Sequence, residues 1–171
     1  YVDRKYMHFS DDSNVMKYIK NAEVVIFCTH GTAEEILKYR NNPDKPYEEY
    51  ILIDKNNMEV LEGKIILAFC CSSAKILGEL CVNNPNPCKA YVGFRSDIVY
   101  DNGSAKKSRH LIYESYKKAF SKSLKYAVRT KCTVEQFKVS LLLYMRRESV
   151  KAILESANHS LNTMYAGTMN G

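Results

Sequence analysis

Two short and strongly apolar runs constrain the fold of this chain more than any other feature of its sequence. They are Val24–Cys28 and residues 64–70, and each predicts a strand that is buried on both faces. Helical patterns alternate with them at residues 11–21 and 33–39 and again from residue 71 onward. This alternation predicts an α/β fold with a mostly parallel sheet flanked by helices on both faces.

Weaker signals fill in the rest of the chain. Residues 1–9 predict a weak strand, residues 90–94 another strand, and residues 50–54 and 58–61 the arms of a hairpin. The last third is helical in pattern, with an apolar residue every four positions. Thr133 and Gln136 predict a capping box at the start of its final helix. That helix would present four side chains to a core, namely Phe137, Leu141, Tyr144 and Met145.

Length and the absence of long apolar segments define the class of protein. The 171 residues are enough for one compact domain, and we expect a single domain over residues 1–171. No run approaches the roughly 18 apolar residues of a membrane span, and the polar start lacks a signal peptide. We therefore expect no membrane partner. Because the chain begins at Tyr1 rather than Met, we expect it to be a C-terminal part of a longer polypeptide.

Six cysteines are present, and several lie in apolar runs. In a chain of this length they favour reduced thiols and a cytoplasmic location over a disulfide framework. Cys81 and Cys88 bracket an Asn/Pro loop and could ligate zinc, but no second ligand pair lies nearby in the sequence, which favours two structural or loop cysteines. We expect neither a metal nor another cofactor.

The net charge of +6 is concentrated in one segment. Residues 104–132 carry nine basic side chains and a single acidic one, Glu114. A nucleic-acid surface is one interpretation. The segment has an apolar opposite face and no aromatic residues alternating with its charges, which favours a solvated or domain-facing surface. We expect nucleic acid as an indirect partner at most.

The two apolar runs end in residues suited to nucleophilic catalysis. His30 follows the first run and Cys71 follows the second. The carboxyl ends of neighbouring parallel strands share one edge of a sheet, so an imidazole and a thiol there could act as a pair. The N–H groups of Gly31 and Cys71 would form an oxyanion hole, with Cys71 at a helix start that lowers the pKa of its thiol. Position alone leaves a structural role for both residues open.

Residues 22–31 (AEVVIFCTHG) and 64–74 (KIILAFCCSSA) resemble the caspase-like cysteine peptidases, most closely the CHAT-domain branch shared with separases. In that family one strand ends in His-Gly. A second strand ends in a small residue, the nucleophilic Cys, any residue, Ser, and then Ala or Gly. Cys70, Cys71, Ser73 and Ala74 match the second motif, over a resemblance that spans roughly residues 11–157. The first strand of such a domain would lie upstream of Tyr1.

The resemblance implies a cysteine endopeptidase that cleaves a protein substrate through a thioester. It also implies a regulated effector of a larger bacterial protein, controlled by a sensor domain or subunit. A shift of one residue would make Cys70 the nucleophile instead of Cys71.

Several further residues are candidates for binding the substrate near the nucleophile. Asp97 and Asp101 could receive a basic side chain and Arg95 an acidic one, although solvated loop charges are the alternative interpretation of all three; Ser73 belongs to the motif itself. The loop over residues 40–49 could gate the site.

Two other classes of function remain as alternatives. One is a catalytically inactive caspase-like scaffold or binding module, although an inactive copy has no reason to keep His30, Gly31 and Cys71 together. The other is a flavodoxin-like or nucleotide-binding module, which lacks support because no glycine-rich phosphate loop occurs. Metalloprotease and serine-hydrolase motifs are missing too.

Overall fold

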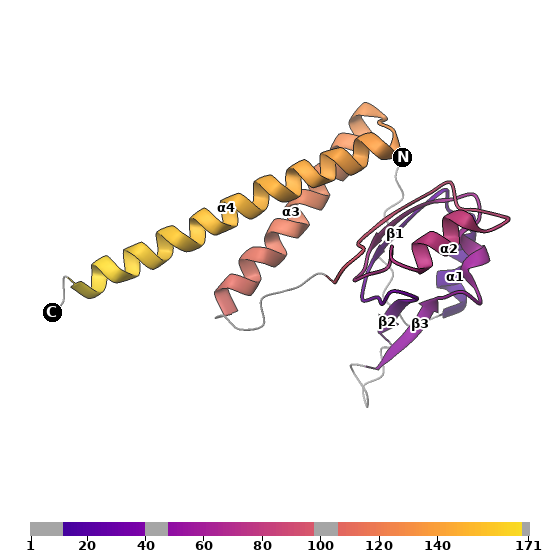
Figure 1. The fold of residues 1–171 in the computed structure, drawn as a ribbon, viewed down its shortest axis with the longest axis horizontal. Coiled ribbons are helices and arrows are strands. Elements are labelled where there is room, and N and C mark those ends of the chain that lie inside the picture. The colour runs from indigo at the N-terminus through magenta and orange to yellow at the C-terminus, as the bar shows by residue number, and fades with distance from the viewer. Residues whose placement is uncertain (1–11, 40–47, 98–105, 169–171) are drawn as a thin grey trace. The chain divides into compact units, whose positions relative to one another are not determined.

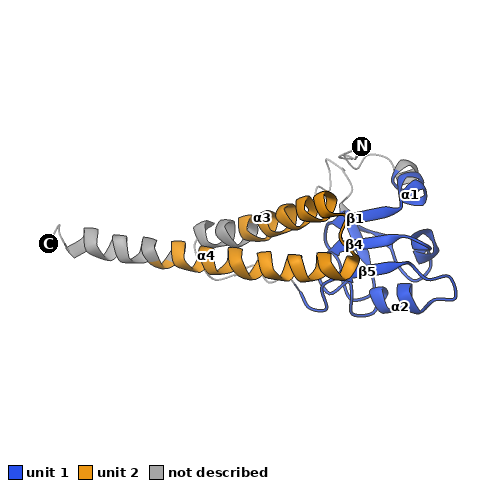
Figure 2. Ribbon diagram, turned by 90° about the horizontal axis from the view of Figure 1, so that it is seen from above, with its two compact units in different colours: residues 1–98 blue, residues 99–171 orange. Residues whose placement is uncertain are grey.

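The computed structural model describes residues 12–39, 48–97 and 106–168. Contacts within the chain divide it into two compact units, residues 1–98 and 99–171 (Figure 2). The predicted strand at residues 1–9 lies outside the described residues. The expectation of a single domain over the whole chain stays a prediction.

The first unit is built on a three-stranded parallel sheet, whose strands are labelled in Figure 2; Figure 1 labels other helices and strands of the same unit. Its strands are β1 (Val24–Cys28), β4 (Ile65–Phe69) and β5 (Ala90–Gly93), in the order β1-β4-β5. These are the three strands that the apolar runs predict, within one residue at each end. The α/β class and the parallel sheet are therefore confirmed.

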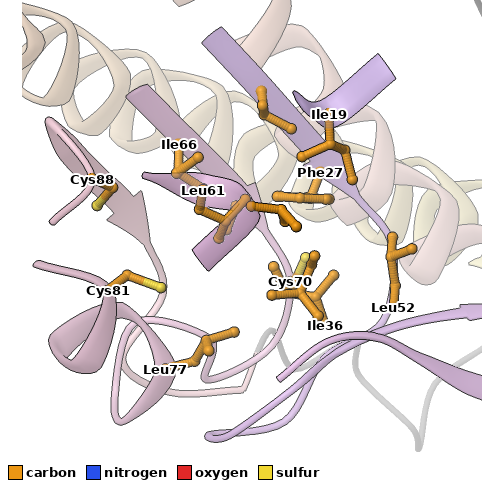
Figure 3. Close-up of a cluster of buried hydrophobic side chains, with 14 of the residues drawn as sticks. Ile19, Phe27, Ile36, Leu52, Leu61, Ile66, Cys70, Leu77, Cys81 and Cys88 are labelled. Atoms are coloured by element: carbon orange, nitrogen blue, oxygen red, sulfur yellow. The ribbon is translucent and has the colours of Figure 1, made fainter. Parts of the chain in front are cut away.

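One face of this sheet carries the core of the unit (Figure 3). Three helical segments contribute to it: α1 (Asp12–Asn21), the 3-10 helix η1 (Met58–Leu61) and α2 (Leu77–Asn83). Along β1 the side chains alternate, so that Val25 and Phe27 are buried while Val24 and Ile26 are 48% and 43% exposed. The expectation that β1 is buried on both faces is wrong, because the core residues of these helices all pack on the Val25 face.

A two-stranded antiparallel sheet replaces two predicted elements. Its strands are β2 (Ile36–Tyr39) and β3 (Glu49–Ile53), so the helix expected at 33–39 is wrong. The hairpin expected between residues 50–54 and 58–61 is also wrong. β3 pairs instead with β2, the strand before it in the chain, and residues 58–61 form η1. Asn57 turns the chain there: its side chain accepts a hydrogen bond from the Asp54 N–H at 2.9 Å and donates one to the Leu52 carbonyl at 3.0 Å.

The second unit is a pair of long helices, α3 (Lys106–Thr130) and α4 (Val134–Thr168). The capping box is confirmed: the Thr133 N–H donates to the Gln136 side chain at 2.9 Å, and the Gln136 N–H donates to the Thr133 hydroxyl at 3.2 Å. Of the four side chains expected in a core, Phe137 and Leu141 are buried, whereas Tyr144 and Met145 are only half-buried. Most of the described basic side chains of α3 are exposed, consistent with a solvated face.

Candidate active site

The sheet brings the predicted histidine and cysteine to the same edge. Cys28, the last residue of β1, is level with Phe69, the last residue of β4. His30 and Cys71 each follow two positions later, beyond the carboxyl ends of neighbouring parallel strands. This is the edge at which α/β proteins bind ligands. The expected adjacency of these two strands is confirmed.

Gly31 is the closest link between the two strand ends. A Cβ atom built on Gly31 would lie 2.7 Å from the Cβ of Cys70 and 3.2 Å from the carbonyl oxygen of Cys71. Only a residue without a side chain fits this approach without displacing its neighbours. The loop after β1 is therefore packed directly against the cysteine pair.

The same glycine begins a short antiparallel bridge. Gly31 pairs with Ile36, and the two hydrogen bonds around them run from the Thr32 N–H to the Glu35 carbonyl and from the Leu37 N–H to the His30 carbonyl. Neither bond uses the N–H of Gly31. This pairing therefore does not engage the donor that the oxyanion hole requires.

The two adjacent cysteines have opposite surroundings. Cys70 has no exposed surface, belongs to the hydrophobic core, and its burial raises the pKa of the thiol to about 12. Cys71 is partly exposed. Because the thiolate is the nucleophile, a buried thiol with a raised pKa is a poor one. The surroundings favour Cys71 over the alternative register at Cys70.

The segment after Cys71 corrects a further expectation, the helix start at Cys71. Residues 71–76 form turns, and α2 begins only at Leu77. The prediction that Cys71 lies at a helix N-terminus is therefore wrong, and the helix dipole does not supply the activation expected there. Ser72 adopts a left-handed backbone conformation with φ 51°, which is uncommon for a residue other than glycine.

The loop that follows β5 holds this turn in place. The Ser72 N–H donates to the Ser96 carbonyl at 3.1 Å, and the Ser72 hydroxyl donates to the Asp97 carboxylate at 2.6 Å. The Ala74 N–H donates to the Phe94 carbonyl at 2.9 Å. These three bonds place Asp97 beside the residue that follows Cys71.

Of the other candidates for substrate binding, Arg95 is already paired and Ser73 is buried. Arg95 is paired with Glu79 of α2 at 2.8 Å, so its charge is already matched. Ser73 is fully buried and donates to the Cys70 carbonyl at 3.1 Å, which gives it a structural role and removes it from the surface that a substrate could reach. Asp101 and most of the loop over residues 40–49 lie outside the described residues.

Glu49 is a residue of this site that the sequence did not predict. Its carboxylate oxygen lies 3.4 Å from Nδ1 of His30. Pairing of β2 with β3 brings it there, since Tyr39 at the end of β2 is level with Glu49 at the start of β3. The sequence placed Glu49 only at the end of the loop that could gate the site; because residues 33–39 predicted a helix, nothing in it paired Glu49 with His30.

In the part of the chain that the structure describes, no cluster of side chains supports a metal site. No group of three or more His, Cys, Asp or Glu side chains there could hold an ion. Cys81 and Cys88 are buried, and burial raises the pKa of the Cys81 thiol to about 12, which disfavours the thiolate that zinc needs.

Comparisons of the chain with protein-family models, curated proteins and solved structures find no match.

Proposed function

We propose that this protein is a cysteine endopeptidase of caspase-like fold in which Cys71 is the nucleophile and His30 the general acid and base. The observation that supports it best is the shared edge of β1 and β4, where both residues follow the paired strands by two positions. Gly31, packed against Cys70 and Cys71, ties the two strand ends together. The protein substrate and a regulating domain or subunit follow from the family resemblance.

The reaction uses only groups at this edge. His30 takes the thiol proton while the sulfur of Cys71 forms a bond to the peptide carbonyl carbon, and the Gly31 and Cys71 N–H groups hold the oxyanion. The C–N bond then breaks, and His30 donates the proton to the leaving amine. Water attacks the thioester, which releases the acid and restores the thiol. Without a helix terminus at Cys71, activation of the thiol depends on His30.

The position of Asp97 favours a basic residue before the scissile bond. Its carboxylate is exposed and is anchored by Ser72, the neighbour of the nucleophile, whereas Arg95 is matched by Glu79. A second carboxylate oxygen is left to receive a Lys or Arg side chain of the substrate.

Cleavage of a peptide library tests this preference. We expect Asp97→Asn to reduce cleavage after basic residues about tenfold or more, because the ion pair with the substrate side chain is lost. Arg95→Gln is the control and should leave the preference unchanged; equal losses in both variants would exclude Asp97 as the specificity residue.

The dyad is tested by the reactivity of each thiol with limiting iodoacetamide near pH 6.5, followed by peptide mass mapping. We expect Cys71 to be alkylated fastest, and His30→Ala to slow that alkylation about a hundredfold, because the base that removes the thiol proton is gone. Cys70→Ala is the matched control and should retain the fast site, whereas Cys71→Ala should lose it. Uniform slow labelling that His30→Ala leaves unchanged would contradict the proposal and favour the inactive scaffold.

A further inference from the structure

The contact between His30 and Glu49 is the starting point for a further inference. Its atoms, Nδ1 and Oε1, lie 3.4 Å apart, and the two side chains are 61% and 37% exposed. A contact this exposed adds little to the free energy of unfolding, because water screens it and two side chains must be ordered. We therefore expect this contact to affect the orientation of the His30 imidazole rather than the stability of the fold.

The backbone on both sides of this pair is fixed by hydrogen bonds. The carbonyl of His30 accepts a bond from the Leu37 N–H at 3.0 Å, and the hydroxyl of Thr29 donates to the Leu37 carbonyl at 2.7 Å. Leu37 belongs to β2, and β2 is paired with the strand that Glu49 begins. One small sheet thus holds the histidine loop and the glutamate in register.

A carboxylate at Nδ1 determines which nitrogen of the ring acts as the base. A carboxylate oxygen 3.4 Å from Nδ1 favours the tautomer in which Nδ1 carries the proton, so the neutral imidazole keeps its lone pair on Nε2. When Nε2 takes the proton of a thiol, the same carboxylate stabilises the imidazolium that forms. We propose that Glu49 is the positioning residue of the active site, setting the tautomer of His30. This inference rests on the proposed function.

The chain offers a matched control next to Glu49. The carboxylate of Glu48 accepts a hydrogen bond from the Tyr50 hydroxyl at 2.7 Å, so it has its own partner on the same strand. Glu49→Gln and Glu48→Gln remove the same charge at adjacent positions. A general loss of negative potential would affect both variants equally, whereas a positioning role belongs to Glu49 alone.

The experiment measures the rate constant for alkylation of Cys71 by iodoacetamide and the tautomer of His30 by nitrogen-15 NMR, both on the full chain. We expect Glu49→Gln to lower the rate constant about tenfold, less than for the buried aspartate of a serine protease because this pair is exposed. Glu49→Asp should recover part of the rate, and Glu48→Gln should stay within about twofold of the wild type. The NMR spectrum should show Nδ1–H in the wild type and a shift toward the other tautomer in Glu49→Gln.

Different results would contradict the positioning role of Glu49 and the proposed His30–Cys71 dyad. If His30→Ala slows alkylation while Glu49→Gln matches Glu48→Gln and leaves the tautomer unchanged, Glu49 has no positioning role and the dyad stands. If His30→Ala leaves alkylation unchanged, the dyad itself fails.

Discussion

At the scale of single residues, the site depends on a position where a side chain has no room. Gly31 approaches the backbone and the Cβ of the cysteine pair so closely that any Cβ would overlap with Cys70. Gly63 is different: it has a positive φ of 67°, and a Cβ there would meet no atom within 4 Å. One glycine provides space and the other provides backbone freedom.

This difference predicts distinct effects for two alanine substitutions. Gly31→Ala should lower the free energy of unfolding by about 1–3 kcal/mol through overpacking, and should slow alkylation of Cys71 because the two strand ends are pushed apart. Gly63→Ala should lower it by about 1 kcal/mol through backbone strain alone, with alkylation unchanged. Denaturation curves and labelling rates check both, and normal labelling in Gly31→Ala would show that the close approach does not position Cys71.

At the scale of elements, the second unit is held together by a buried charge. Glu148 of α4 is almost fully buried, and its carboxylate accepts a hydrogen bond from Lys122 of α3 at 2.6 Å. That hydrogen bond, together with the nearby lysine charges, holds the pKa of Glu148 below its ordinary value. The neighbouring helices are thus linked by one carboxylate that must stay ionised.

The pH dependence of Glu148 follows from the direction of its shift. Because its pKa is lower in the folded chain than in the unfolded one, its stabilisation is present above the ordinary value of 4.5 and is lost as the pH falls through the lower folded value. We expect Glu148→Gln to lower the free energy of unfolding by about 1–2 kcal/mol at neutral pH, less than for a fully buried pair because Lys122 is partly exposed. The difference from the wild type should shrink below about pH 4.

Urea denaturation followed by helical circular dichroism measures this effect at both pH values. Glu135→Gln is the control, since Glu135 pairs with Lys138 of the same helix but is 71% exposed. It should change the free energy of unfolding by less than about 0.5 kcal/mol. A pH-independent effect of Glu148→Gln would show that packing, rather than charge, holds the two helices together.

At the scale of the whole molecule, the described site residues belong entirely to the first unit, between His30 and Asp97. The second unit contributes two helices, and in the described residues no helix is both long and apolar enough to cross a bilayer. Several apolar side chains of α4 are nonetheless exposed, including Leu142, Leu143 and Ile153. The reaction that we propose requires residues of the first unit only, because the described site residues all lie there.

Elements whose pattern is local could be predicted from the amino-acid sequence. The strands β1, β4 and β5 follow from uninterrupted apolar runs, α1 and the paired helices from helical periodicity, and the start of α4 from the capping box. The positions of His30 and Cys71 beyond two of those strands are part of the same information. For these elements a window of a few residues already contains the physical cause.

Features that depend on partners far along the chain could not be predicted from local sequence and became visible in the folded structure. Residues 36–39 form a strand because β3 pairs with them, and that pairing brings Glu49 to His30. The core makes Cys70 a buried thiol beside a partly exposed Cys71, and the loop after β5 fixes the turn that delays α2 to Leu77. A segment of four residues fits a helix or a strand about equally well, so hydrogen bonds and burial supplied by distant segments settle its conformation.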